Sequence, residues 1–165
     1  MNVIYKENIS KEKKEMIEYV IDFTLKVWGV DSSKINLYTV FNFKNEESEL
    51  NLDENQKNEG AGFLIKYDKN NYGLFLREEV IYNNSDCEEE KYVNFLRILI
   101  HEIIHLKQYL SEELYFNSKD EFMWKGKNVD NLNYEDMPHE IEAYEFQDKV
   151  LLLFFEEFSV LHEAI

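Results

Sequence analysis

Two histidines lie four residues apart around a glutamate in the segment RILIHEIIHLKQYL, residues 97–110. On a helix, His101 and His105 would share one face, and both could direct a ring nitrogen at one metal ion. Glu102 lies beside them, within reach of a water molecule that it could deprotonate. The pattern predicts half of a hydrolytic zinc site. The alternative is a buried helix that carries two histidines by chance.

The setting of the two histidines favours the metal site. The chain has only four histidines, and two of them fall in this apolar segment, where an imidazole without a partner is costly. They share a helix face with Ile98 and Gln108, apart from the apolar stripe predicted for a helix over residues 88–111. That stripe consists of Tyr92, Leu96, Leu99, Ile103, Leu106 and Leu110. We therefore expect one side of this helix to pack and the other to be open for chemistry.

A zinc site of this type needs a third protein ligand and one position open for water. The candidates lie in PHEIEAYEFQ, residues 138–147. On a helix, Glu140 shares its face with apolar residues further along that must point inward, whereas Glu142 shares a side with Glu145 that suits solvent. We expect Glu140 to be the third ligand, with Glu142 and His139 as alternatives.

The two motifs together resemble a known class of enzyme. HEIIH followed by EIEAYEF is similar to the gluzincin metallopeptidases, and HEIEAYEF resembles the E-x-E-A-x-x-F helix of ImmA/IrrE-like peptidases and small phage-type zincins. The resemblance covers residues 95–150. It implies that His101, His105 and Glu140 hold zinc and that Glu102 is the catalytic base.

Four further residues are candidates for supporting this site. Many gluzincins have an Asp or Asn at the position of Tyr144, where it orients a ligating histidine. Tyr144 or Gln108 is expected to take that role here. Tyr134 and His139 are candidates for donating a hydrogen bond to an oxyanion, as catalytic Tyr or His does in related zincins. The alternative for Tyr134 is an ordinary surface tyrosine in a loop.

The elements that must position these residues begin with a helix. Ser10 can cap a helix that runs to about Trp28, with Gly29 as its stop. The alternating segment INLYTVFNF, residues 35–43, predicts a strand. AGFLIKY (61–67) and YGLFLREEV (72–80) predict a hairpin around DKNN. The polar segment at residues 44–60 predicts a loop.

Two further elements are expected after the histidine helix. FMWKGKNVDNLNY, residues 122–134, predicts a short strand or hairpin, and residues 137–158 predict the last helix, with Pro138 in its first turn. The helix over residues 88–111 is expected to be the longest. This order favours a single α+β domain over residues 1–165. By the resemblance it would be zincin-like, with a small mixed sheet, an N-terminal helix, an HExxH helix and a third-ligand helix.

Composition excludes several partners. The formal net charge is −16, from 18 Lys and Arg against 34 Asp and Glu. This argues against binding to nucleic-acid phosphates and to anionic membranes. No segment is long and apolar enough for a membrane span, and the N-terminus lacks the apolar run of a secretion signal. With a single cysteine, Cys87, and no intramolecular disulfide, these features predict a cytoplasmic protein.

We therefore expect a zinc metallopeptidase that acts on a protein or peptide substrate, with Glu102 as general base. The alternative is a non-catalytic acidic binding or regulatory protein on the same scaffold, which the net charge favours. The intact His-Glu-x-x-His motif argues against it, because a decoy has no need to keep Glu102, which is not a ligand. Hydrolysis of a non-peptide amide would use the same site and is not distinguished by the sequence.

Overall fold

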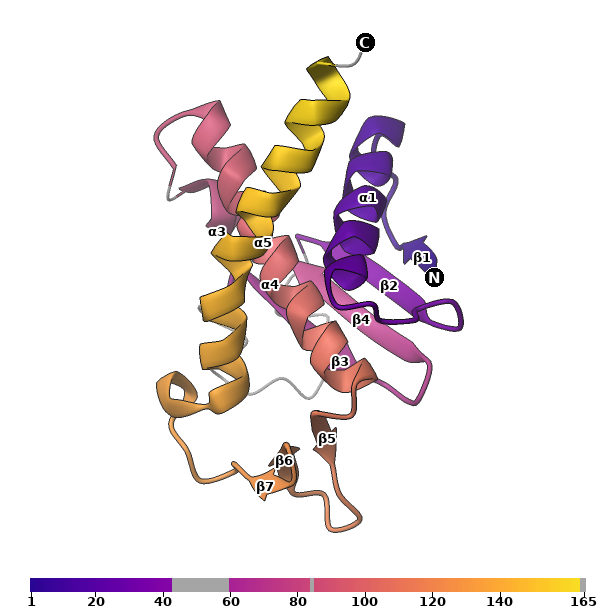
Figure 1. Ribbon diagram of the computed structural model, residues 1–165, viewed down its shortest axis with the longest axis vertical. Coiled ribbons are helices and arrows are strands. Elements are labelled where there is room, and N and C mark those ends of the chain that lie inside the picture. Colours follow the sequence, from indigo (N-terminus) through magenta and orange to yellow (C-terminus); the bar gives the residue numbers. More distant parts are fainter. Residues whose placement is uncertain (43–59, 84, 164–165) are drawn as a thin grey trace.

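The computed structural model describes residues 1–42, 60–83 and 85–163 of the 165-residue chain, with side chains described as far as residue 159. The loop predicted over residues 44–60 lies outside this part of the chain, except for its last residue. Within it, the fold combines helices with a four-stranded sheet and a small three-stranded sheet (Figure 1). This confirms the predicted α+β class. None of the described helices is long and apolar enough to cross a membrane.

The larger sheet has the strand order β1-β2-β4-β3. Its strands are β1 (Asn2–Tyr5), β2 (Asn36–Phe41), β3 (Gly62–Lys66) and β4 (Asn71–Leu76). The first three in this order run parallel, and β3 runs antiparallel to β4. The predicted strand near residues 35–43 and the predicted hairpin are therefore present. β3 forms an edge of the sheet.

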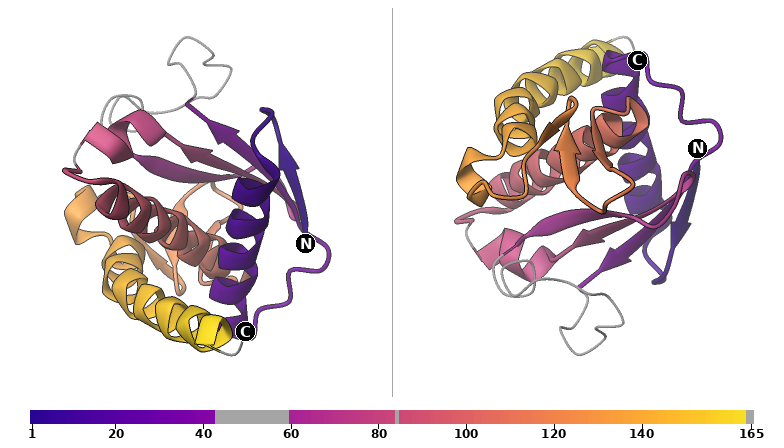
Figure 2. Two further views of the ribbon diagram at one scale, coloured as in Figure 1. Left: turned by 90° about the horizontal axis from the view of Figure 1, so that it is seen from above. Right: turned by 90° about the horizontal axis from the view of Figure 1, so that it is seen from below.

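Three helices lie in two layers on one face of this sheet. α1 (Lys11–Val27) and α4 (Glu88–Leu110) lie over the sheet, and α5 (Pro138–Glu163) packs on the far side of α4 (Figure 2). α1 begins and ends as predicted: the Ser10 side chain accepts from the Lys13 N–H at 3.2 Å, and Gly29 has a φ of 62°. α4 is thus enclosed between the sheet and α5.

The end of the hairpin differs from the prediction. Its second strand was expected to reach residue 80, but β4 ends at Leu76 and the short helix α3 (Glu78–Asn83) follows. The Asn42 side chain accepts from the Glu78 N–H at 3.0 Å and satisfies a backbone donor in the first turn of α3. Because Asn42 follows β2, this contact depends on strand pairing. The strand β1, also not predicted, depends on a parallel pairing between distant residues.

A small sheet follows α4. It consists of β5 (Leu114–Phe116), β6 (Phe122–Trp124) and β7 (Lys127–Asn128), paired antiparallel in that order. The last two strands are the predicted hairpin, with Gly126 at a φ of 81° in its turn; β5 was not predicted. The helix predicted over residues 88–111 is present as α4. It has 23 residues and α5 has 26, so the expectation that it would be the longest helix was wrong.

Burial of α4 extends beyond the predicted stripe. Leu96, Leu99, Ile103 and Leu106 are fully buried, but Tyr92 is 42% exposed. The opposite face, which carries both histidines, is buried as well because α5 covers it. The prediction of an open second face was therefore wrong. The candidate chemistry lies in a buried site between two helices.

Candidate metal centre

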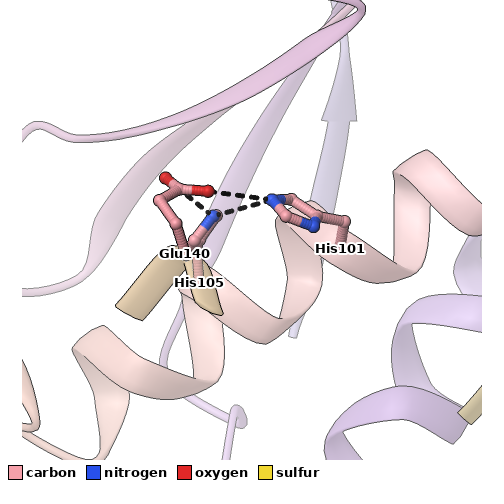
Figure 3. Close-up of side chains that lie close together, drawn as sticks. All are labelled: His101, His105 and Glu140. Carbon is pink, nitrogen blue, oxygen red and sulfur yellow. Dashed lines mark hydrogen bonds and ion pairs between the residues drawn. The ribbon is translucent and has the colours of Figure 1, made fainter. Parts of the chain in front are cut away.

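A cluster of metal-ligand groups lies where α4 meets the first turn of α5. His101 and His105 come from α4 and Glu140 comes from α5, and all three are buried (Figure 3). Ala143, one turn after Glu140, is fully buried, and its small side chain lets the two helices approach closely. The structure thus brings together the three residues that the sequence indicated as ligands.

The spacing of the candidate ligand atoms is close to the spacing around a tetrahedral metal ion. Nε2 of His101 lies 3.1 Å from Nε2 of His105 and 3.3 Å from Oε2 of Glu140. Nε2 of His105 lies 3.4 Å from the other oxygen of Glu140. Ligand atoms about 2.0–2.2 Å from a tetrahedral zinc ion are roughly 3.3–3.6 Å apart. Two imidazoles and a carboxylate are also a donor set of catalytic zinc sites.

The other ring nitrogen of each histidine has a glutamine partner. Nδ1 of His105 lies 2.8 Å from Oε1 of Gln108, and Nδ1 of His101 lies 3.0 Å from Oε1 of Gln147. Gln108 was one of the two residues expected to orient a histidine. Tyr144, the other, packs its ring against His101 with centroids 4.6 Å apart. Gln147 makes the hydrogen bond to His101, a role that the sequence did not indicate.

Glu102 lies beside the cluster without belonging to it. The side chain is buried, and burial raises the pKa of its carboxyl group. Gly62 of β3 passes directly against it: a Cβ atom at Gly62 would lie 3.1 Å from Oε1 of Glu102 and 2.9 Å from Cγ2 of Ile98. Gly62 was not among the residues predicted to belong to the site. A glycine inside a predicted strand, which often marks a close approach, was the available signal.

Among the described residues, the edge strand β3 has backbone groups beside Glu102 that no neighbouring strand pairs with. The Arg77 N–H donates to Ala61 O at one end of the hairpin, and the Tyr67 N–H donates to Asn71 O at the other. In an antiparallel pair the hydrogen-bonded residues alternate. Gly62 and Leu64 therefore direct their N–H and C=O groups away from β4. No described strand pairs with this edge.

Tyr134 lies at the exposed side of the cluster. It belongs to the 3-10 turn η2 (Tyr134–Asp136), and its OH donates to Oε2 of Glu140 at 2.8 Å. Burial and the negative charge of Glu140 raise the pKa of its hydroxyl group, so the group is a neutral donor at ordinary pH. The phenol is 58% exposed. Tyr134 thus joins the site to solvent.

His139 lies next to the cluster and is buried. Its Nε2 is 3.6 Å from Oε1 of Glu140, and its ring packs edge-on against Phe122 with centroids 5.1 Å apart. Burial lowers the pKa of its imidazole to about 4, so the ring is neutral near pH 7. Its Nδ1 has no hydrogen-bond partner among the described residues. The three candidate ligands whose ligand atoms all lie within 4.8 Å of one another are His101, His105 and Glu140, so His139 is not one of them.

The cluster is charged in the absence of a metal. Burial opposes the charge on Glu140, but hydrogen bonds from both histidines hold the pKa of its carboxyl group well below the usual range. Burial likewise opposes the charge on His105, and the hydrogen bond with Glu140 and the charge of Glu102 outweigh it and raise the pKa of the imidazole to about 9. Near neutral pH, His105 and Glu140 therefore form an ion pair where a metal ion would fit.

Glu142 does not lie in solvent as predicted. Its side chain is 19% exposed, and Oε1 accepts from Nζ of Lys125 at 2.9 Å. Lys125 belongs to the turn between β6 and β7, so the small sheet folds over the beginning of α5. As the helical phase predicted, Glu142 lies on a different side of the helix from Glu140. The turn between β6 and β7 covers that side, which the helical phase cannot indicate.

No family model matches this chain, and no curated protein sequence matches it at a significant level.

Proposed function

We propose that this protein is a zinc-dependent peptidase with a zincin-like fold. Zinc would be held by His101, His105 and Glu140, with Glu102 as the general base. One observation carries the proposal: a buried carboxylate, Glu102, lies beside a cluster of three ligand groups without being part of it. A site that only binds metal has no use for this carboxylate.

The number of ligand groups supports a catalytic site. Structural zinc sites are closed by four protein ligands, whereas catalytic sites have three and leave a position for water. Among the described residues, the cluster contains three such groups. Zinc bound there would supply a Lewis acid that polarises the scissile carbonyl group and lowers the pKa of water to about 7.

The roles of Glu102 follow from its burial. As a base it takes a proton from the attacking water molecule, and as an acid it passes this proton to the leaving amine. Burial raises the pKa of its carboxyl group. A raised pKa makes the carboxylate a stronger base toward the attacking water molecule than an exposed carboxylate would be.

Tyr134 is the favoured donor to the developing oxyanion. Its hydroxyl group is neutral, lies 2.8 Å from Glu140 and belongs to an exposed side chain, so it can reach both the cluster and a substrate. His139 is the second candidate. Its ring is only 4% exposed and packs among aromatic side chains, which favours Tyr134 for direct contact with substrate.

The substrate class is suggested by the edge of the sheet. β3 directs backbone groups of Gly62 and Leu64 away from β4, beside Glu102. An extended peptide can add to such an edge by backbone hydrogen bonds. A mixed sheet with an antiparallel edge strand next to the HExxH helix, and a third-ligand helix packed on that helix, also supports the zincin-like assignment.

The test is cleavage of unfolded protein and peptide mixtures by the zinc-loaded full-length chain. Glu102→Gln should bind zinc as the wild type does and lose hydrolysis by about 10²–10⁴, the contribution of a general base. Glu145→Gln, an exposed change on α5, is the matched control and should retain activity. A Glu102→Gln variant that cleaves as fast as the control would contradict the proposed mechanism.

A further inference from the structure

We propose that Glu142 is a positioning residue of the metal centre, although it is not a ligand. Together with the backbone oxygen of His139, it holds the side-chain amide of Gln108 in one orientation, and this amide determines which nitrogen of His105 carries a hydrogen. The inference rests on the proposed zinc site and deepens it. It assigns a role to a residue that the sequence placed in solvent.

The amide of Gln108 has three partners in a fully buried position. Its Nε2 lies 3.0 Å from the backbone oxygen of His139 and 3.0 Å from Oε2 of Glu142, and its Oε1 lies 2.8 Å from Nδ1 of His105. Carbonyl and carboxylate oxygens can only accept hydrogen bonds. The NH₂ group of Gln108 must therefore face His139 and Glu142. The flipped amide would place oxygen against two oxygens.

This orientation determines which hydrogen His105 keeps when the ring loses a proton to bind a metal ion. The amide oxygen of Gln108 cannot donate, so Nδ1 of His105 must carry the hydrogen between them. Nε2 is then the ring nitrogen that faces His101 and Glu140, at 3.1 and 3.4 Å from their nearest candidate ligand atoms. A metal ligand needs a nitrogen without a hydrogen atom. The Gln108 amide thus selects the atom that can bind zinc.

Glu142 is itself held by one lysine of α4 and one lysine of the small sheet. Its Oε1 lies 2.9 Å from Nζ of Lys125 and its Oε2 lies 3.7 Å from Nζ of Lys107. Glu113, which precedes β5, lies within 2.6 Å of Lys107 and 3.7 Å of Lys125. Two lysines and two glutamates therefore alternate around the back of the site. Through Glu142 and Gln108, this network connects the small sheet to His105.

His101 has no comparable arrangement and serves as an internal reference. Its Nδ1 lies 3.0 Å from Oε1 of Gln147. Among the described residues, no acceptor is hydrogen-bonded to the amide nitrogen of Gln147, so nothing there excludes the flipped amide. A change at Glu142 should therefore affect His105 and leave His101 unchanged.

The first experiment compares zinc affinities by competition with a chelator of known affinity. Glu142→Ala should weaken zinc binding, by at most the roughly 10–100-fold that removing a direct partner of a ligand costs, because the His139 backbone oxygen still contacts the Gln108 amide. Glu142→Gln keeps an oxygen that can accept from Gln108 and should restore most of the affinity. Glu145→Ala, on the same helix and exposed, is the matched control. Equal affinities for Glu142→Ala and Glu145→Ala would overturn the inference.

The second experiment uses ¹⁵N-resolved NMR of the zinc-loaded and metal-free protein to detect which ring nitrogen of each histidine carries a hydrogen. The wild type should show a hydrogen-bonded Nδ1–H of His105 in both forms, and Glu142→Ala should lose or shift this signal while that of His101 stays. A wild-type His105 without a hydrogen on Nδ1 would overturn the inference, even if the variants do not fold. Neither experiment measures hydrolysis, so an inactive wild type would count against the proposed peptidase and not against Glu142.

Discussion

A Cβ atom at Gly62 would lie 3.1 Å from Oε1 of Glu102, so the edge strand β3 and the candidate base on α4 are in direct contact. This contact couples the place where an extended peptide can bind to the group that would deprotonate water. The atom nearest to that Cβ would be Cγ2 of Ile98 at 2.9 Å, so a larger residue at position 62 would displace Ile98, the Glu102 side chain, or both.

Gly62→Ala should therefore lower the rate of hydrolysis without weakening zinc binding. A displacement of the carboxylate by about 1 Å can cost on the order of 10²-fold in rate, whereas the ligands His101, His105 and Glu140 are untouched. The measurement is kcat/KM together with zinc affinity and melting temperature for the same variant. Wild-type kcat/KM in a folded Gly62→Ala variant would show that the contact does not position the base.

Glu140→Ala should reduce zinc affinity by more than the 10–100-fold expected for a residue that only orients a ligand. Glu140 supplies one of three candidate ligand atoms, and its removal leaves two imidazoles. Competition with a chelator measures the effect, and Glu145→Ala provides the control. If His139→Ala proves more damaging than Glu140→Ala, the assignment of the third ligand to Glu140 is wrong.

Zinc binding near pH 7 should release about one proton. The pKa of His105 in the metal-free protein is raised from its ordinary 6.5 to about 9, so the imidazole is protonated before zinc displaces the proton. Zinc affinity should rise as the pH increases toward 9. The stability of the metal-free protein should change with pH in the opposite direction to zinc affinity. The raised pKa of His105 stabilises the fold fully below about pH 6.5, and this contribution is lost as the pH rises through 9. Calorimetric titrations in buffers of different ionisation enthalpy count the proton, and a count of zero would contradict the charged cluster.

Removal of zinc should lower stability without unfolding the chain. The core around Leu96, Leu99 and Ile103 is fully buried by apolar contacts with the sheet and α1, which do not require a metal. Zinc at about 100 times its Kd stabilises the folded state by about 2.7 kcal/mol, which corresponds to roughly 5–10 °C in melting temperature for a chain of this size. Circular dichroism melts with and without chelator measure this shift. Complete unfolding by the chelator would instead indicate a structural metal site.

Local features of the sequence were sufficient for the candidate ligands. The spacing of His101 and His105 places both on one helix face whatever surrounds the helix, because 3.6 residues make one turn. The phase of the last helix likewise places Glu140 on the same side as Ala143, Val150 and Phe154, all of which are buried. The Ser10 cap and the hairpin before α4 were also predictable, since they depend on neighbouring residues alone.

The tertiary structure decided what covers and supports those residues. The partial burial of Glu142, the hydrogen bond that Gln147 accepts from His101 and the close approach of Gly62 to Glu102 each join elements that are distant in the chain. The periodicity of a helix or strand predicts which residues share a face, but it does not predict which other element packs against that face. For that reason the sequence determined the candidate ligand set, whereas only the packing of β3, α5 and the small sheet on α4 determined which residues contact these candidates.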